Sequence, residues 1–83
     1  MIHELDIVVL AVDLPEHGLL EGDVGTVVMV HKEEAGYEVE FVTFDGETVT
    51  VISLSPPQIR IIGTDEMPRV RKLEKPGSEN RFC

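Results

Sequence analysis

The chain has 83 residues, of which 42% are hydrophobic, and a formal net charge of −9. This length allows one domain with a small core, and the apolar content excludes a disordered chain. The longest apolar run, 7–12, is far shorter than the roughly 20 residues that cross a bilayer. No basic stretch precedes it, and Cys83 is the single cysteine. We therefore expect a cytoplasmic protein with no membrane segment and no disulfide framework.

The charge is divided unevenly between the body of the chain and its C-terminal tail. Residues 1–66 hold fourteen acidic side chains against two basic ones, a balance of −12. Residues 67–83 hold five basic side chains against two acidic ones, a balance of +3. An acidic body repels a phosphate backbone, so nucleic-acid binding is disfavoured. The asymmetry indicates a tail that lies on an acidic surface, either its own or a neighbour's.

The first predicted strand is the β-branched run 5–12. Because both of its alternating faces are apolar, it is either covered on both sides or bends between two sheets. A loop over 13–22 follows, marked by proline and glycine. We expect this loop to expose Leu14, Leu19 and Leu20.

The second predicted strand covers residues 23–30. Gly25 inside it predicts a bulge or a close crossing of two backbones. Asp23, in the pattern Gly-Asp-x-Gly, is expected to accept hydrogen bonds from nearby backbone amides and fix a turn. A structural role of this kind is favoured over catalysis.

The third predicted strand, 37–41, alternates between apolar and acidic residues. This period of two places Tyr37, Val39 and Phe41 inward and the two intervening glutamates outward. Val42 and Phe44 come directly after it. Either a bulge near 41–42 turns both inward, or they form an apolar outer patch of the kind that marks an interface.

The remaining strands follow two turns. Asp45-Gly46 predicts a type I′ hairpin, because that turn needs positive φ at both central residues, and it leads into a strand over 47–54. Two prolines in 55–58 end this strand and predict a 3₁₀ turn before a last strand over 59–62. Five short strands at this spacing predict an all-β domain, a small barrel or a two-sheet sandwich. Beyond it, residues 69–73 are either an added strand or part of a disordered end.

Several motifs in chain order carry a resemblance to a known family: Glu4-Leu-Asp, Asp13-Leu-Pro-Glu-His-Gly-Leu, Gly22-Asp-Val-Gly-Thr-Val-Val and Tyr37-Glu-Val-Glu-Phe, followed by a glycine hairpin. Over residues 1–62 the chain resembles a domain-of-unknown-function family of small bacterial proteins, frequent in cyanobacteria. The resemblance implies a five-stranded SH3-like barrel. We therefore divide the chain into a barrel over 1–63 and a basic C-terminal extension over 64–83, which lies outside the resemblance. The resemblance implies no activity, and therefore transfers no functional residues.

No pattern in the sequence predicts a catalytic site, a cofactor or a metal centre. The three histidines, His3, His17 and His31, lack the spacing of a helical metal site. The hydroxyl residues show no nucleophile motif, and the abundant carboxylates are expected to form a solvated acidic face. We expect a protein that is not an enzyme.

The remaining functions are those of a binding protein. The first hypothesis is a small interaction module that self-associates, as a dimer or tetramer, through its C-terminal tail. Its candidate interface consists of the apolar and basic residues Val42, Phe44, Met67, Arg69, Val70, Arg71, Leu73 and Phe82. The alternative is an antitoxin-like, immunity or accessory protein that binds a basic protein partner through its acidic face.

Overall fold

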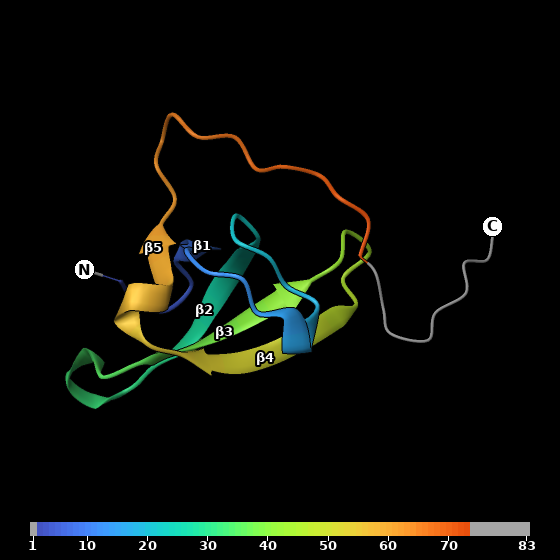
Figure 1. Cartoon of the computed structure of the whole chain (residues 1–83). Helices are drawn as coiled ribbons and strands as arrows, with labels where there is room; N and C mark the ends of the chain where they lie inside the picture. Colours follow the sequence, from blue (N-terminus) through green and yellow to red (C-terminus); the bar gives the residue numbers. More distant parts are fainter. Residues whose placement is uncertain (1, 74–83) are drawn as a thin grey trace.

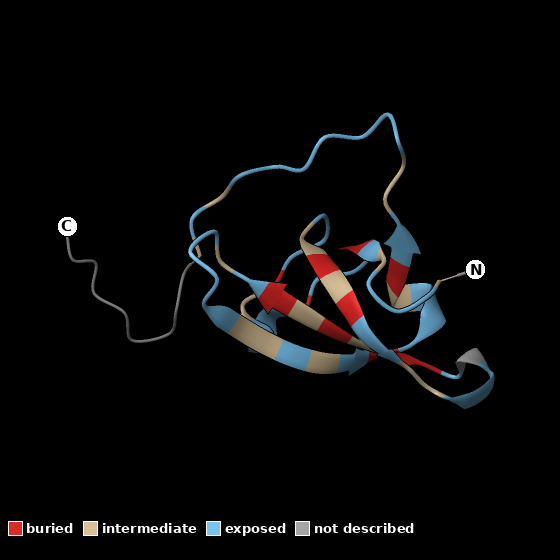
Figure 2. Ribbon diagram, turned by 180° about the vertical axis from the view of Figure 1, so that it is seen from behind, coloured by how far each residue is buried: buried red, intermediate tan, exposed pale blue. Residues whose placement is uncertain are grey.

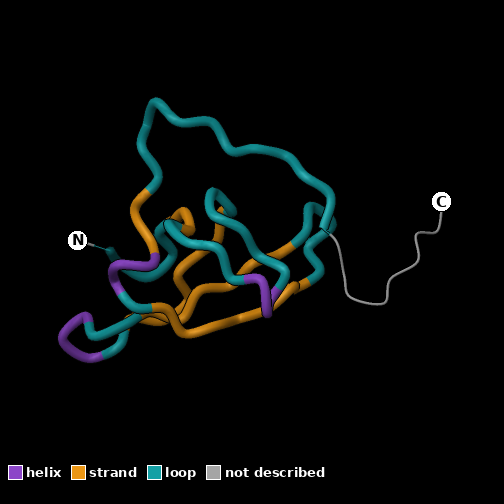
Figure 3. The backbone as a smooth tube through the Cα atoms, in the orientation of Figure 1, coloured by secondary structure: helices purple, strands orange, loops and turns teal. Residues whose placement is uncertain are grey.

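The computed structural model describes residues 2–73, which form five strands and three 3₁₀ turns (Figures 1 and 3). The strands are β1 (Ile7–Leu10), β2 (Val24–Val30), β3 (Tyr37–Val42), β4 (Thr48–Leu54) and β5 (Ile59–Ile61), and the turns are η1 (Pro15–His17), η2 (Lys32–Glu34) and η3 (Pro56–Gln58). The predicted all-β class and the five strands are confirmed.

The strands form one antiparallel sheet in the order β4-β3-β2-β1-β5. β4 and β5 are its two edges and do not pair with each other, so the expected barrel does not close. The link between them is η3, where Pro56 and Pro57 have no N–H to donate and so end the ladder of β4. Ser55 and Gln58 fix the turn instead, since the Ser55 amide donates to Gln58 Oε1 at 2.8 Å.

The core lies against one face of the sheet, where buried and half-buried residues alternate along β3 with the predicted period (Figure 2). Its buried members are Val8, Leu10, Leu14, Leu19, Val27, Tyr37, Val39, Phe41, Leu54 and Ile59. The expected exposure of Leu14 and Leu19 is therefore wrong, and only Leu20 is exposed. The backbones of Leu14 and Leu19 hydrogen-bond to each other, which folds the loop so that both side chains reach the core.

Gly25 lies where two backbones approach closely, as predicted. A Cβ atom at this position would lie 2.7 Å from Val39 Cγ1 and 3.0 Å from the Glu40 carbonyl oxygen. The bulge in β2 lies further along, because the register with β3 shifts between Val27 and Met29. Glycine at position 25 is thus required by the contact with β3.

The hairpin between β3 and β4 differs from the predicted type I′ turn. The Thr43 amide donates to the Glu47 carbonyl at 2.9 Å, and the Gly46 amide donates to the Thr43 carbonyl at 2.9 Å. Gly46 has a φ of 89°, whereas Asp45 keeps a negative φ. These features define a three-residue loop in which only the glycine is left-handed.

Of the two alternatives for Val42 and Phe44, the apolar outer position holds, and the inward-turning bulge is wrong. The register of β3 and β4 shifts between Phe41 and Val42, so the bulge is present. It does not turn the two side chains inward, since Val42 is 51% exposed and Phe44 is fully exposed. Phe44 therefore stands at the tip of the hairpin as an unburied aromatic side chain.

β1 is covered on both faces, as its apolar sequence predicts. Val8 and Leu10 belong to the core, whereas Val9 is buried without belonging to that cluster. Val9 lines a cavity of about 220 Å³ together with Met67 and Pro68. The chain after β5 therefore approaches the second face of β1.

Candidate functional site

The chain leaves β5 and arches back over the sheet toward the hairpin between β3 and β4 (Figures 1 and 2). We call residues 67–73 the strap. It is extended and forms no strand, so residues 69–73 do not add a strand to the sheet. Two ion pairs bracket the strap, one just before its start and one near its end. In the first the body provides the basic residue, and in the second it provides the acidic one.

The first ion pair joins Glu66 to Arg60 on β5. The guanidinium donates two hydrogen bonds to the carboxylate, at 2.7 and 2.8 Å. The Gly63 amide donates to the same carboxylate at 2.6 Å. The hydrogen bonds from Arg60 and then from Gly63 lower the pKa of Glu66 to about 2. Because both side chains are substantially exposed, this pair contributes little stability and mainly sets the direction in which the strap begins.

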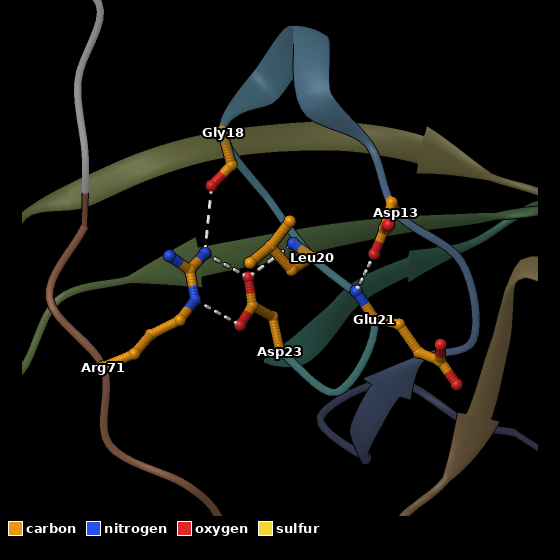
Figure 4. Close-up of polar contacts among 6 residues, drawn as sticks. All are labelled: Asp13, Gly18, Leu20, Glu21, Asp23 and Arg71. Atoms are coloured by element: carbon orange, nitrogen blue, oxygen red, sulfur yellow. Dashed lines mark hydrogen bonds and ion pairs between the residues drawn. The ribbon is translucent and has the colours of Figure 1, made fainter.

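The second ion pair joins Arg71 to Asp23, which lie 48 positions apart in the sequence (Figure 4). Arg71 Nε donates to Asp23 Oδ1 at 2.9 Å, and Nη2 donates to Oδ2 at 2.5 Å. Nη2 also donates to the Gly18 carbonyl at 3.0 Å. The side chains of Arg71 and Asp23 are 27% and 17% exposed, so this contact is more shielded from water than the first. It is the strongest polar link between the strap and the body.

The loop between β1 and β2 holds the Asp23 carboxylate and the Gly18 carbonyl in place through hydrogen bonds of its own. Asp23 Oδ2 accepts a hydrogen bond from the Leu20 amide at 2.9 Å, which confirms the predicted turn-fixing role of this aspartate (Figure 4). In the same loop, Asp13 Oδ1 accepts a hydrogen bond from the Glu21 amide at 2.8 Å. The Gly18 amide donates to the Pro15 carbonyl at the end of η1. The loop is thus a bonded frame that presents a carboxylate and a carbonyl to a guanidinium.

The ion pair with Arg71 makes strap docking dependent on pH. Burial opposes ionisation of Asp23, but the hydrogen bonds from Arg71 and the Leu20 amide outweigh it and lower the pKa below its ordinary 3.8. A lowered pKa stabilises the docked state above the ordinary value, and this stabilisation is lost as pH falls through the lowered value. We expect the NMR signal of the Arg71 Nε–H to move toward that of a solvated arginine as pH falls below 3.8, the ordinary pKa of the Asp23 carboxyl.

The matched control for this titration is Asp23→Asn, in which the Arg71 signal should already be that of a solvated arginine at neutral pH. Amide signals of Val27 and Val39 report whether the core stays folded, since both side chains are fully buried. An Arg71 signal that does not change while the carboxylates titrate would contradict the docking role of Asp23.

A groove lies between the strap and the β3–β4 hairpin, with a volume of about 290 Å³. It brings together six of the eight candidate interface residues: Val42, Phe44, Arg69, Val70, Arg71 and Leu73. Met67 lines the neighbouring cavity, and Phe82 lies outside the described residues. Leu19, Val24 and Phe41 form part of the groove wall on the body side. The candidate residues therefore share one surface although they come from two distant parts of the chain.

The apolar side chains of this surface are poorly buried within one copy of the chain. Val70 is 97% exposed and Met67 is 87% exposed, beside the exposed Phe44. Sequence reasoning selected these residues but missed that Asp23 and Gly18 accept hydrogen bonds from Arg71, and it missed the Arg60–Glu66 pair. The available signal was the charge asymmetry, which indicated a tail on an acidic surface without identifying the acidic residue.

The described residues contain neither a metal-ligand cluster nor a membrane-spanning helix. Within 2–73, no three side chains of histidine, cysteine, aspartate or glutamate gather where they could hold a metal ion. No helix in the same part of the chain is long and apolar enough to span a bilayer.

The fold and the groove define a small, open-sheet β-domain that holds its own basic strap against an acidic loop. The chain belongs to the DUF4926 family, a domain of unknown function, which matches residues 4–61. No curated protein and no solved structure matches the chain. The family match includes Gly18, Asp23 and Arg60, whereas Glu66 and Arg71 lie beyond it. The body side of both ion pairs is therefore part of the family domain, and the strap side is not.

Proposed function

We propose that the protein is a non-enzymatic, cytoplasmic interaction module that self-associates through the surface around the groove between the strap and the β3–β4 hairpin. We call this the groove surface. The observation that carries this proposal is the clustering of Phe44 and Val42 with the strap around one groove. Exposed apolar side chains scattered singly need no explanation, but a contiguous group of them is typical of an interface. The groove surface is such a group.

The size and the charge of the domain also support self-association at the groove. A domain of this size buries a limited share of its apolar surface, so further packing between copies adds usefully to its stability. Two bodies with a balance of −12 repel each other, which disfavours contact between their acidic faces. The basic strap lies beside the groove and offsets this repulsion locally. Association is therefore favoured at the groove and disfavoured elsewhere on the body.

The proposal predicts that Phe44→Lys converts an oligomer into a monomer. The full-length protein should be a dimer or tetramer by light scattering, and the variant should be monomeric at the same concentration. The reason is that a lysine ammonium at the hairpin tip would have to be desolvated inside an apolar contact. Because Phe44 is fully exposed within one copy, its replacement leaves the fold intact.

A matched pair of variants separates the groove from other exposed apolar positions. Val42→Lys and Met29→Lys change side chains that are 51% and 53% exposed, but only Val42 lines the groove. The first should weaken association and the second should not. A full-length protein that stays monomeric at high micromolar concentration would overturn the proposed function.

The acidic face supports a second candidate, an antitoxin-like or immunity protein that binds a basic partner. Glu38 and Glu40 point outward from β3, and hydrogen bonds from Ser53 and His31 lower the pKa of Glu38. His31 Nε2 lies 2.8 Å from the Glu38 carboxylate. A face that stays ionised in mild acid suits fast, salt-sensitive association with a cationic protein. Recovery of one stoichiometric basic partner at low salt, lost at high salt, would favour this candidate.

A further inference from the structure

The frame around Asp23 is a recognition site for a guanidinium group. It offers two carboxylate oxygens and the Gly18 carbonyl, and the planar fork of an arginine matches this arrangement. The Leu20 amide orients the carboxylate, and that hydrogen bond is internal to the loop. Every acceptor of the site therefore belongs to the body, whereas the arginine comes from the strap.

The strap satisfies this site but leaves its own apolar side chains in water. Arg71 is bonded, whereas Val70 and Met67 remain almost fully exposed. The hydrogen bonds that hold the strap end on the body come from the Arg71 side chain, since residues 67–73 form no strand. Undocking the strap therefore breaks no sheet ladder. Within one chain, therefore, the charged side chain of Arg71 is paired, but the apolar side chains of Val70 and Met67 are not buried.

We propose that the strap is exchanged between two copies, so that Arg71 of one copy occupies the Asp23 site of the other. This inference rests on the proposed self-association and names the contact that performs it. The exchanged ion pair has the same partners as the internal one, so no polar contact is lost. The bodies come together at the groove, which buries Val70 and Phe44 between them. Apolar burial therefore favours exchange as concentration rises, whereas tethering favours the internal contact at low concentration.

The length of the strap limits where the second copy can lie. Glu66 stays bound to Arg60 of its own body, so only the residues after it cross to the partner. Five residues of extended chain from Glu66 to Arg71 span about 17 Å. The two bodies must therefore touch near the strap, and the groove is the apolar surface at that position.

Two complementary variants test the exchange. Arg71→Ala leaves an intact Asp23 site with no arginine to fill it, and Asp23→Asn leaves an arginine with no carboxylate to receive it. The asparagine keeps an acceptor oxygen for the Leu20 amide, so the loop frame survives. We expect each variant alone to associate about tenfold more weakly than the wild type, because a strap without its ion pair is undocked in the free chain and must be ordered on association. An equimolar mixture should form a heterodimer, detected by native mass spectrometry with one variant isotopically labelled.

A variant carrying both substitutions is the matched control and should pair with neither single variant. If both single variants associate as strongly as the wild type, the exchange is overturned while the proposed self-association stands. A mixture that shows no heterodimer, beside a wild type that dimerises, overturns it in the same way. A wild type that is monomeric in every preparation overturns the exchange and the proposed function together. Circular dichroism of each variant verifies that the sheet is retained.

Discussion

Replacing Gly25 with alanine should destabilise the domain by about 3 kcal/mol, the upper part of the usual range for overpacking a core. The added Cβ would lie 2.7 Å from Val39 Cγ1, 2.8 Å from Phe41 Cε2 and 3.0 Å from the Glu40 carbonyl oxygen. Val39 and Phe41 are buried in the core and cannot move aside without displacing their own neighbours. β2 and β3 would have to separate at this point. Urea unfolding followed by circular dichroism measures the loss.

Gly46→Ala is the control that separates crowding from backbone conformation. Nothing lies within 4 Å of a Cβ at Gly46, so its cost comes only from the left-handed φ of 89°. That conformation costs an L-residue about 1–2 kcal/mol. If the two alanine variants lose equal stability, close contact with β3 is not the reason for glycine at position 25.

Asp23→Ala should be the most damaging single change at the site, with a loss of about 2–3 kcal/mol. It removes the acceptor of Arg71 and also the acceptor of the Leu20 amide. A hydrogen bond to a charged group contributes about 1.5–3 kcal/mol, and the partly buried bonds from Arg71 account for most of the loss. The same denaturant unfolding measures the loss, and faster hydrogen exchange at the Leu20 amide should accompany it.

Arg71→Ala provides the comparison, because it releases the strap and leaves the loop frame bonded. We expect it to cost about 1 kcal/mol, since the carboxylate it leaves behind can be solvated once the strap departs. Its Leu20 amide should exchange at the wild-type rate. Equal losses for the two variants would show that the Leu20 hydrogen bond contributes nothing to stability.

The strands were predictable because local sequence determines them. The alternation of Tyr37, Val39 and Phe41 with glutamates has the period of a strand with one buried face, and β3 has that pattern of burial. The prolines before β5 predicted its 3₁₀ turn for an equally local reason. Even Asp45-Gly46 gave the position of the hairpin correctly. It gave the wrong turn type, because the bulge beside Val42 changes the loop that the strands require.

The site was predictable only in part, because its contacts join distant residues. Val42 and Val70 could be selected for being apolar where solvent was expected, but their meeting at one groove depends on the path of the strap. The pairing of Asp23 with Arg71 has no local signature, since any of fourteen acids in the body could have received the arginine. Leu14 and Leu19 were misread for the same reason. Their burial depends on a backbone contact that closes the loop.

The two ion pairs that bracket the strap determine the direction in which this segment of the chain can lie on the body. Reading toward the C-terminus, the acid Glu66 meets a base of the body, and then the base Arg71 meets an acid. A segment laid down in reverse would place like charges opposite each other at both positions. When two copies exchange straps reciprocally, each gives the other the same contact, so the two copies are related by a twofold axis. Each copy then uses its Arg71 guanidinium and its Asp23 site, so the exchange closes at two copies and cannot grow into a fibre.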